Sequence, residues 1–385
     1  MVQLTSALAI GLIGLTAVVS AHPGHDVHAE AAERASFLKN AKVHQRSLAQ
    51  CASKLKARGH ENANVVRRAN RVKAIRQKRG LQHNAHFHKA RSFNSVLNTD
   101  HNSTLVGVSA STDPAVLFGS EATCILGPDV TAGPYYVTGE LIRENIVEDQ
   151  EGVPLFMDIQ LINTNTCEPM PEIYTDLWHC NATGVYSGIV ASGNGDSSDE
   201  TNIESTWLRG IQPSDENGVI YMESIFPGHY TGRAIHIHVL THPVNETTVN
   251  ANGTISGLYS SSSSHIGQIF FDQDLITDVE KTAPYNTNTQ VLTTNADDWI
   301  LAEEADTIDP FMEYVYLGDS VSDGIFAWIS MGIDPTEDKS VTPAAYYTEE
   351  GGVENENSGS GMDGSPPGMS GSSTTAAAGS RRTTS

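Results

Sequence analysis

Two histidines in this 385-residue chain are spaced so that both could bind one metal ion. His236 and His238 lie in the alternating run RAIHIHVL, residues 233–240, which is typical of a strand. Every second side chain of a strand points to the same side, so the two imidazoles share one face, roughly 7 Å apart at their α-carbons. Their ring nitrogens are then close enough to bind a common ion.

Two phenols accompany the histidine pair. Tyr230 follows the turn residues Pro227 and Gly228, which allow the backbone to bring a phenol towards the strand. Tyr186 follows the segment WHCNATGV, residues 178–185. Phenolate oxygens are hard anionic donors that favour Fe(III), whereas two histidines with a carboxylate suit Fe(II). The four residues therefore predict a ferric site, at which the metal ionises phenols whose ordinary pKa is about 10.

Three of these residues, Tyr186, His236 and His238, belong to a series of five motifs along the chain. The motifs are GPYY (133–136), DLWH (176–179), GVYS (184–187), RAIHIH (233–238) and GQIFF (267–271). In this order they resemble the motifs of the intradiol ring-cleavage dioxygenases. The resemblance covers about residues 120–335. It implies an Fe(III) enzyme that uses O2 to open catechols between their two hydroxyls, giving muconate-type diacids.

The resemblance also implies a role for each metal ligand. Tyr186 and His236 would lie in the equatorial plane, with Tyr230 and His238 at the two axial positions. Tyr230 would be displaced by the substrate and take one of its protons, while a bound hydroxide takes the other. Two phenolates and one hydroxide would balance the charge of the ion.

Further site residues follow from the same motifs. Arg233 and Gln268 match catalytic positions, where a guanidinium could stabilise negative charge that develops on the substrate. The alternative for Arg233 is a surface ion pair. Pro134, Tyr135 and Tyr136 would lie near the substrate pocket, as they do in the family.

The scarcity of cations favours an uncharged substrate. Residues 93–300 contain four Lys or Arg, of which Arg143, Arg209 and Lys281 remain once Arg233 is assigned. A ring carboxylate, as on protocatechuate, would need a cationic partner. We therefore expect catechol, hydroxyquinol or lignin-derived diols rather than carboxylated rings.

Short alternating runs between turn residues dominate the chain from about residue 120, which predicts an all-β domain over 120–345. The clearest strands are 155–161, 219–226 and 325–329. Alternation shows only that strands prevail. The resemblance adds the architecture, a sandwich of mixed β-sheets related to the prealbumin-like fold.

The first part of the chain has a different composition. Residues 1–21 contain an apolar stretch that ends in small residues, as a signal peptide does. Residues 29–78 favour helix, and the dibasic pairs Arg67-Arg68 and Lys78-Arg79 are typical processing sites. We expect residues 22–79 to form a removable basic pro-segment; a permanent helical arm is the alternative. Residues 80–119 would be a linker.

Secretion predicts a disulfide and glycans. Cys124, Cys167 and Cys180 lie in the range of the family resemblance, so we expect one disulfide among them, with the pairing left open. Four sequons, at Asn102, Asn181, Asn245 and Asn252, predict a glycoprotein. Residues 346–385, rich in Gly, Ser and Thr, predict a disordered tail.

The net charge of −23 is distributed unevenly. Residues 22–92 carry sixteen of the 23 Lys and Arg and four of the 46 acids, so the remainder is strongly acidic. Such a domain does not favour nucleic acid or anionic membrane, and the expected partners are a small aromatic diol and O2. The family often forms a homodimer through an N-terminal helical segment, but residues 29–78 match that segment in no motif.

Two alternatives compete with the dioxygenase. A cupin also uses a His-x-His strand, but it needs a glutamate a few residues later, and His238–Pro243 contains none. A secreted β-sandwich that binds a ligand or a cell surface, without catalysis, would explain the sequons and the tail. It would not explain four ligand residues and Arg233 occurring together.

Overall fold

The computed structural model describes residues 48–81, 118, 123–125, 133–191, 193–242, 247–257, 262–263, 265–305, 309–337 and 339–355. The predicted signal peptide, most of the predicted linker and most of the predicted tail lie outside these residues, as do the sequons at Asn102 and Asn245. No helix in the described part is long and apolar enough to cross a bilayer.

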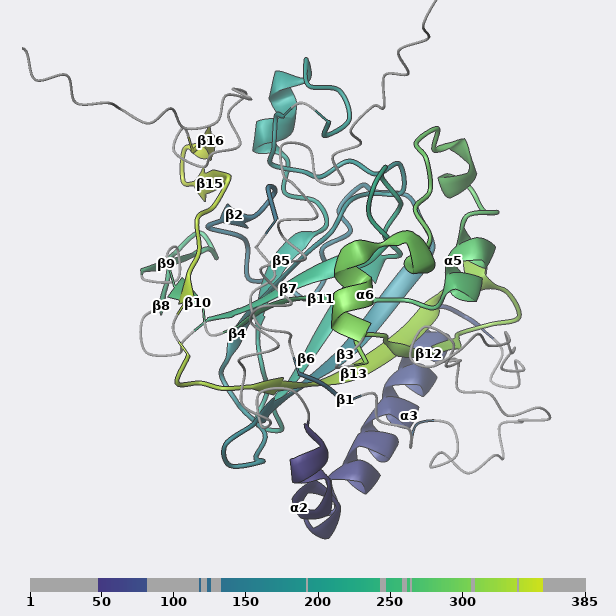
Figure 1. Cartoon of the computed structure of the whole chain (residues 1–385), viewed down its shortest axis with the longest axis vertical. Coiled ribbons are helices and arrows are strands. Elements are labelled where there is room, and N and C mark those ends of the chain that lie inside the picture. The colour runs from purple at the N-terminus through teal and green to yellow at the C-terminus, as the bar shows by residue number, and fades with distance from the viewer. Residues whose placement is uncertain are drawn as a thin grey trace, which may run out of the picture.

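Two sheets form the body of the molecule (Figure 1). The first has the order β1-β13-β3-β6, with β12 also paired to β13, and it mixes parallel and antiparallel pairs. Its strands are β1 (Thr123–Ile125), β3 (Pro154–Asn163), β6 (Val219–Ile225), β12 (Glu313–Tyr316) and β13 (Ile325–Ile333). The second sheet is antiparallel, in the order β11-β7-β4-β5. Its strands are β4 (Tyr174–Trp178), β5 (Arg209–Pro213), β7 (His236–His242) and β11 (His265–Phe270).

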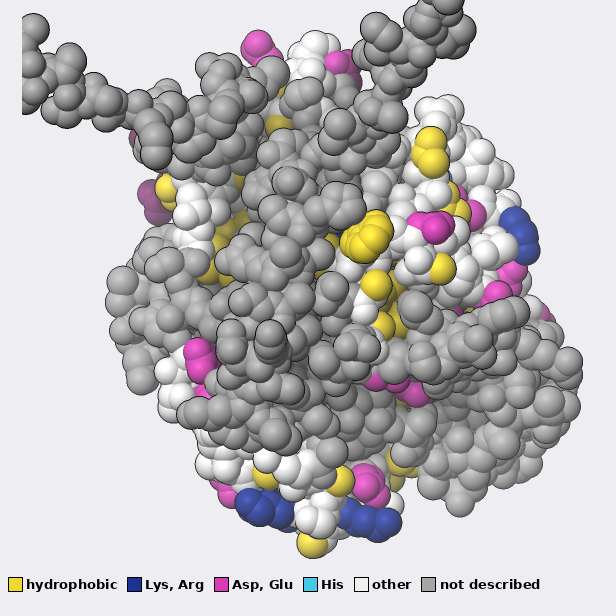
Figure 2. Space-filling view, in the orientation of Figure 1, with side chains coloured by type: hydrophobic (Ala, Val, Ile, Leu, Met, Phe, Trp, Pro, Cys, Tyr) yellow, Lys and Arg dark blue, Asp and Glu magenta, His cyan; other side chains and the backbone are white. Residues whose placement is uncertain are grey.

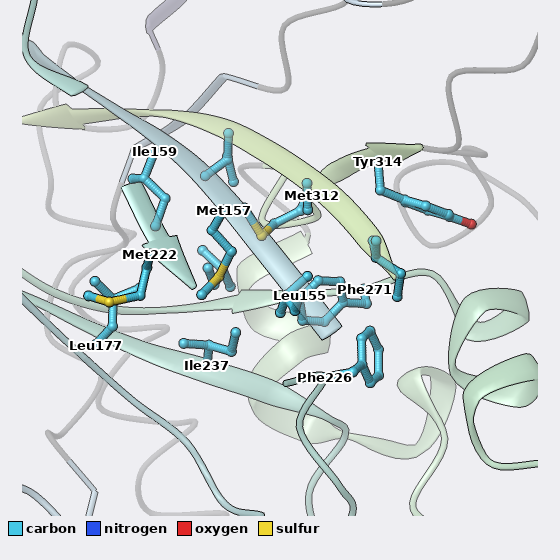
Figure 3. Close-up of a cluster of buried hydrophobic side chains, with 14 of the residues drawn as sticks. Leu155, Met157, Ile159, Leu177, Met222, Phe226, Ile237, Phe271, Met312 and Tyr314 are labelled. Atoms are coloured by element: carbon cyan, nitrogen blue, oxygen red, sulfur yellow. The ribbon is translucent and has the colours of Figure 1, made fainter. Parts of the chain in front are cut away.

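Apolar side chains from both sheets form one core between them (Figure 3). Leu155, Met157 and Ile159 alternate along β3 and meet Ile237 of β7 in this core. Because neighbouring residues of a strand point to opposite faces, His236 and His238 project from the other side of β7. The prediction of an all-β sandwich with mixed sheets is confirmed.

Helix α3 (His60–Lys78) covers the outer face of the first sheet, far from the histidine pair in the layer order (Figure 1). Val65, Val72 and Ile75 pack against Phe326 and Trp328 of β13 in a second apolar cluster. Long apolar and polar side chains on β3 and β13 are therefore buried on both faces of the sheet.

A buried carboxylate fixes this helix to the sheet. Asp158 of β3 is fully buried, and its two oxygens accept hydrogen bonds from Arg67 at 2.8 and 3.0 Å. Arg68, also fully buried, lies 3.6 Å from the same carboxylate. Removing these partners would leave an uncompensated charge inside the protein.

The described part of the segment predicted as helix over 29–78 is broken once. Helix α2 (Ala52–Ala57) has Arg58 as its C-cap, and Gly59, with φ of 72°, turns the chain into α3. A left-handed residue of this kind ends many helices, and glycine adopts it without strain. Removal of residues 22–79 as a pro-segment stays a prediction.

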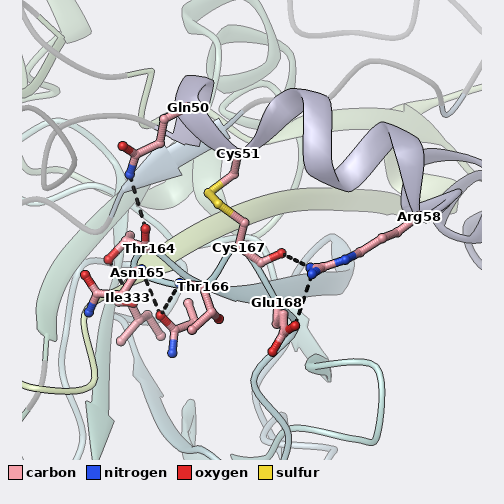
Figure 4. The surroundings of a disulfide bond; sticks show 10 residues. Gln50, Cys51, Arg58, Thr164, Asn165, Thr166, Cys167, Glu168 and Ile333 are labelled. Carbon is pink, nitrogen blue, oxygen red and sulfur yellow. Dashed lines mark hydrogen bonds and ion pairs between the residues drawn. A yellow bond between two sulfur atoms is a disulfide. The ribbon is translucent and has the colours of Figure 1, made fainter.

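The disulfide pairs Cys51 with Cys167, so the expectation of a bond among Cys124, Cys167 and Cys180 is wrong (Figure 4). Cys180 is buried and has a free thiol. The bond connects the residue before α2 to the turn after β3, where Arg58 donates to the Cys167 carbonyl at 2.8 Å. Packing of the N-terminal helices on the sheet brings together two cysteines that are 116 residues apart.

Replacing Cys51 by serine is expected to lower the free energy of unfolding by about 2–4 kcal/mol, because the unfolded chain loses a long-range constraint. Urea unfolding of the oxidised protein measures the change. The Cys167→Ser and doubly substituted proteins should be destabilised equally, since all three lose the same bond. Additive losses would contradict this assignment.

The remaining described elements are short and lie around the two sheets. They are β2 (Val137–Thr138), β8 (Thr247–Val249), β9 (Ile255–Gly257), β10 (Ser262–Ser263), β14 (Lys339–Ser340), β15 (Ala345–Thr348), β16 (Gly351–Glu354), α5 (Gln273–Val279), α6 (Trp299–Ala305) and five 3-10 turns at Leu48–Cys51, Glu200–Glu204, Tyr285–Thr287, Asn295–Asp297 and Val321–Asp323. The hairpin of β15 and β16 occupies residues 345–354, and all of it after residue 345 lies in the range predicted as tail. On the face in Figure 2, Lys and Arg are seen mostly at the end formed by α2, where Lys54 and Lys56 are exposed.

Candidate metal centre

The structure brings together the four side chains that the sequence singles out as ligands. The Nε2 atoms of His236 and His238 are 3.1 Å apart, and the Tyr230 hydroxyl is 3.4 Å from Nε2 of His236. The Tyr186 ring lies 5.7 Å from the Tyr230 ring and 6.1 Å from the His238 ring, between ring centroids. All four side chains are at least 94% buried, with exposures of 1 to 6%.

The hydrogen bonding of His236 leaves one ring nitrogen available as a ligand. Its Nδ1 lies 2.7 Å from the carbonyl oxygen of Ala234, which can only accept, so Nδ1 carries the proton. Nε2 of the neutral ring then has its lone pair directed at His238 and Tyr230. Neighbouring nitrogen ligands of one ion, at about 2.1 Å from it, lie about 3 Å apart, which is close to the observed spacing.

Burial keeps both phenols protonated in the absence of a cation. Burial is the largest cause that raises the pKa of Tyr186, and the neighbouring Tyr230 raises it further. Burial also raises the pKa of Tyr230 above its usual range, and the charge of Arg233 opposes this shift. The Tyr186 hydroxyl has no well-formed hydrogen bond to any described residue. A strongly charged metal ion would both ionise these phenols and satisfy that buried oxygen.

Asn194 holds the backbone of Tyr186, a role that we did not predict from the sequence. Its side-chain oxygen accepts from the Tyr186 amide at 2.7 Å, and its nitrogen donates to the Tyr186 carbonyl at 2.8 Å. Asn202 donates to the same carbonyl at 2.8 Å. The phenol thus projects from a loop that two buried amides fix in place.

Aromatic rings and a glycine form the walls around His238. Trp178 is buried and stacks on the His238 ring at 4.7 Å with an interplanar angle of 3°. Gly133 has φ of 71°, and a Cβ there would lie 3.1 Å from Cε1 of His238. The first residue of the GPYY motif therefore needs to be glycine for its backbone to approach the imidazole.

The three residues predicted near the substrate pocket have different surroundings. The Tyr135 ring lies 4.9 Å from the Tyr186 ring, beside the four ligands. Tyr136 packs on Trp178 instead, and its hydroxyl donates to Asp176 at 3.3 Å, so it lies one ring further away. Pro134 is buried between Gly133 and Tyr135.

Arg233 is fully buried and paired, which differs from the surface ion pair considered as its alternative. Its Nε donates to Asp298 at 2.9 Å, and its Nη2 donates to the Gln268 side-chain oxygen at 2.5 Å. Gln268 pairs directly with His238 across β11 and β7, so both side chains lie on one face. Nε2 of Gln268 is buried with no hydrogen-bond partner in the described part of the chain. It is a donor held beside the imidazoles.

Asp298 is the main site residue that we did not identify from the sequence. One carboxylate oxygen accepts from Arg233 and from the Ala234 amide, at 2.9 and 2.7 Å. The other accepts from the amides of Ile300 and Leu301 at the start of α6. Asp298 therefore fixes both the guanidinium and the entry to the histidine strand.

Two further buried histidines, His179 and His229, have other partners. His179 contacts Ser224 at 2.7 Å and the Cys180 carbonyl at 2.8 Å. His229 contacts Glu280 at 2.9 Å and the Gln290 carbonyl at 3.0 Å. Within the described residues, no three His, Cys, Asp or Glu side chains gather as a metal site. Metal binding by this cluster therefore depends on the two phenols.

The chain matches solved structures, but no family model and no curated protein matches it. Solved structures that it resembles are intradiol ring-cleavage dioxygenases. One such enzyme from Tetranychus urticae is 29% identical with a TM-score of 0.45, and the match covers 56% of this chain and 97% of that one.

Two bacterial structures are more distant. The dioxygenase domain of a dioxygenase carbohydrate-binding protein fusion from Streptomyces sp. SirexAA-E is 22% identical, with a TM-score of 0.32, over 54% of this chain and 97% of that one. Catechol 1,2-dioxygenase from Acinetobacter sp. ADP1 is 16% identical, with a TM-score of 0.32, over 55% and 61%.

Proposed function

We propose that this protein is a secreted ferric dioxygenase that cleaves catechol-type aromatics between their two hydroxyls. The observation that carries this proposal is the buried cluster of Tyr186, Tyr230, His236 and His238, with two imidazole nitrogens 3.1 Å apart. Both atoms of O2 would enter the product, so that catechol and O2 give one muconate-type diacid with no other reactant.

The donor set fits ferric iron. Two phenols supply two hard anionic oxygens once ionised, and the imidazoles supply neutral nitrogens, a combination that favours a trivalent ion over Fe(II) or zinc. When bound, ferric iron would hold both oxygens of a catechol and draw electron density from the ring. We assign the four ligands to Tyr186, Tyr230, His236 and His238.

The surrounding residues would control protons and charge. Tyr230 is the least buried ligand at 6% exposure, and its phenolate oxygen could take a proton from a catechol that replaces it. Arg233 supplies a fixed positive charge that already favours ionised Tyr230 and Tyr186. Gln268 offers an unused N–H donor for an oxygen of the substrate.

An uncharged ring is the preferred substrate. Arg143 pairs with Glu148 and with backbone carbonyls, while Arg209 donates to Ser187 and lies 3.8 Å from Glu140. Lys281 is exposed and pairs with Asp278. These three cations have partners of their own, so a ring carboxylate would lack the counter-ion that it needs.

Iron loading and a visible spectrum test the proposal. The ferric protein should be red to burgundy, since tyrosinate transfers charge to Fe(III), and adding catechol should shift the band. Turnover should consume O2 and yield a diacid, and catechol should turn over faster than protocatechuate.

Three results would count against it. A purified protein that contains stoichiometric zinc, and whose visible spectrum does not change when catechol is added, would rule out the proposed reaction. A colourless protein that binds ligand without turnover would favour the non-catalytic β-sandwich module. Faster turnover of protocatechuate would overturn the substrate preference alone.

Secretion of the protein is part of the same proposal. The Cys51–Cys167 disulfide suits an oxidising compartment, which supports export of the protein. The small aromatic diol and O2 would be its partners, and a homodimer would need a contact that the N-terminal motifs do not predict.

A further inference from the structure

A short segment outside both sheets contacts the two loops that carry the phenols. We call residues 288–293 the strap; it follows the turn at Tyr285–Thr287 and precedes Asn295–Asp297. The Tyr186 loop spans residues 181–186, and the Tyr230 loop spans residues 228–232. Neither tyrosine lies on a strand, so turns and side-chain hydrogen bonds set their positions.

One side chain of the strap bonds to both loops. Gln290 donates from Nε2 to the Thr183 carbonyl at 3.0 Å, three residues before Tyr186. Its Oε1 accepts from the Thr231 amide at 3.2 Å, one residue after Tyr230. A single planar amide thus fixes the distance between the two backbones that carry the phenols.

Other strap residues hold the Tyr230 loop from the same side. Asn288 donates to the His229 carbonyl at 2.7 Å, and the Gly232 amide donates to Thr293 at 2.9 Å. The Val291 amide donates to the Thr231 hydroxyl at 3.2 Å. The strap therefore forms hydrogen bonds with residues on both sides of Tyr230.

The Tyr186 loop and the Tyr230 loop also contact each other next to Gln290, so the distance between them can change little. Gly184 has φ of 83°, and a Cβ there would lie 2.2 Å from the His229 carbonyl oxygen and 2.5 Å from Nε2 of Gln290. The Gly228 amide donates to the Asn181 carbonyl at 3.2 Å. Glycine at 184 allows this close approach.

We infer that Gln290 is a positioning residue, which sets the spacing of Tyr186 and Tyr230 for binding one metal ion. The inference rests on the proposed ferric site. Residues that orient metal ligands without touching the metal typically change its affinity about 10- to 100-fold. Gln290 has the contacts for such a role, because it acts on both phenols through their backbones.

Two variants distinguish the contributions of the two hydrogen bonds made by the Gln290 side chain. Gln290→Met keeps the length of the side chain and loses both hydrogen bonds. Gln290→Glu keeps an acceptor for Thr231 and loses the donor to Thr183. Gln273→Ala is the control, because Gln273 accepts from the Asn295 amide at 2.8 Å and makes no described contact with either tyrosine loop.

Ferric affinity and the charge-transfer spectrum are the main readouts. Gln290→Met should bind Fe(III) about 10-fold more weakly or worse and shift the tyrosinate band, with Gln290→Glu between it and the wild type. Gln273→Ala should bind Fe(III) as the wild type does. Wild-type affinity and an unchanged band in Gln290→Met would overturn the inference.

A second readout needs no iron. In the metal-free protein, Gln290→Met should speed hydrogen exchange of the Thr231 amide, which has lost its acceptor, while exchange in the core strand β3 stays unchanged. Faster exchange throughout would mean general destabilisation and would overturn a local role. If the wild type lacks a ferric band, the proposed function fails, whereas this exchange result still tests the strap.

Discussion

Replacing His236 by glutamine is expected to remove bound iron and reduce catechol turnover by more than about a thousandfold. Residues that only orient a metal ligand typically cost about 10- to 100-fold, and loss of the ligand itself costs more. Glutamine approximates the volume of the imidazole but does not reproduce the lone pair of Nε2. This nitrogen lies 3.1 Å from Nε2 of His238 and 3.4 Å from the Tyr230 hydroxyl. Iron content per chain and oxygen uptake measure the two effects.

His242 provides a matched control on the same strand and the same face. It is buried, and its Nε2 contacts Asp176 at 3.0 Å rather than any proposed ligand. His242→Gln should keep its iron and its colour, even with some loss of stability. Equal loss of iron from both variants would mean that the effect arises from the fold of β7 and not from ligation.

Replacing Asp298 by alanine is expected to lower the free energy of unfolding by about 3–5 kcal/mol, because it leaves the fully buried Arg233 without its counter-charge. The substitution also removes acceptors from the Ala234 amide and from two amides of α6. Denaturant unfolding measures the loss.

Two neighbouring substitutions sharpen this result. Asp298→Asn keeps the shape and some of the acceptors, so it should be less destabilised than Asp298→Ala while still losing turnover. Asp297→Ala removes an exposed carboxylate that accepts from Thr294, and it should change stability by no more than about 0.5 kcal/mol. If Asp298→Ala is as mild as Asp297→Ala, the buried pair does not stabilise the fold.

Local pattern was sufficient to predict the histidine half of the site. Alternation alone placed His236 and His238 on one face, because the two-residue period of a strand is set by backbone geometry. The same two-residue alternation predicted the strands that the structure has as β3, β6 and β13. No local period applies to Tyr186 and Tyr230, which lie in loops; their assignment came from motif order.

Contacts between segments far apart in the sequence could not be predicted from local sequence patterns. Asp298 is 65 residues from Arg233 and is one of 46 acids, so nothing in its neighbourhood marks it as the partner. The Cys51–Cys167 bond depends on how the N-terminal helices dock, which spacing does not encode. The break at Gly59 could have been found, since glycine after a basic turn is a common helix end.

The disulfide changes what proteolysis at the dibasic pairs would produce. Arg68 is fully buried against Asp158, so the Arg67-Arg68 pair is shielded in the folded protein, whereas Lys78 and Arg79 are exposed. Cutting after Arg79 would yield two polypeptides that still migrate together until a reductant separates them. Maturation by such a cut would nick the molecule without discarding its basic helices.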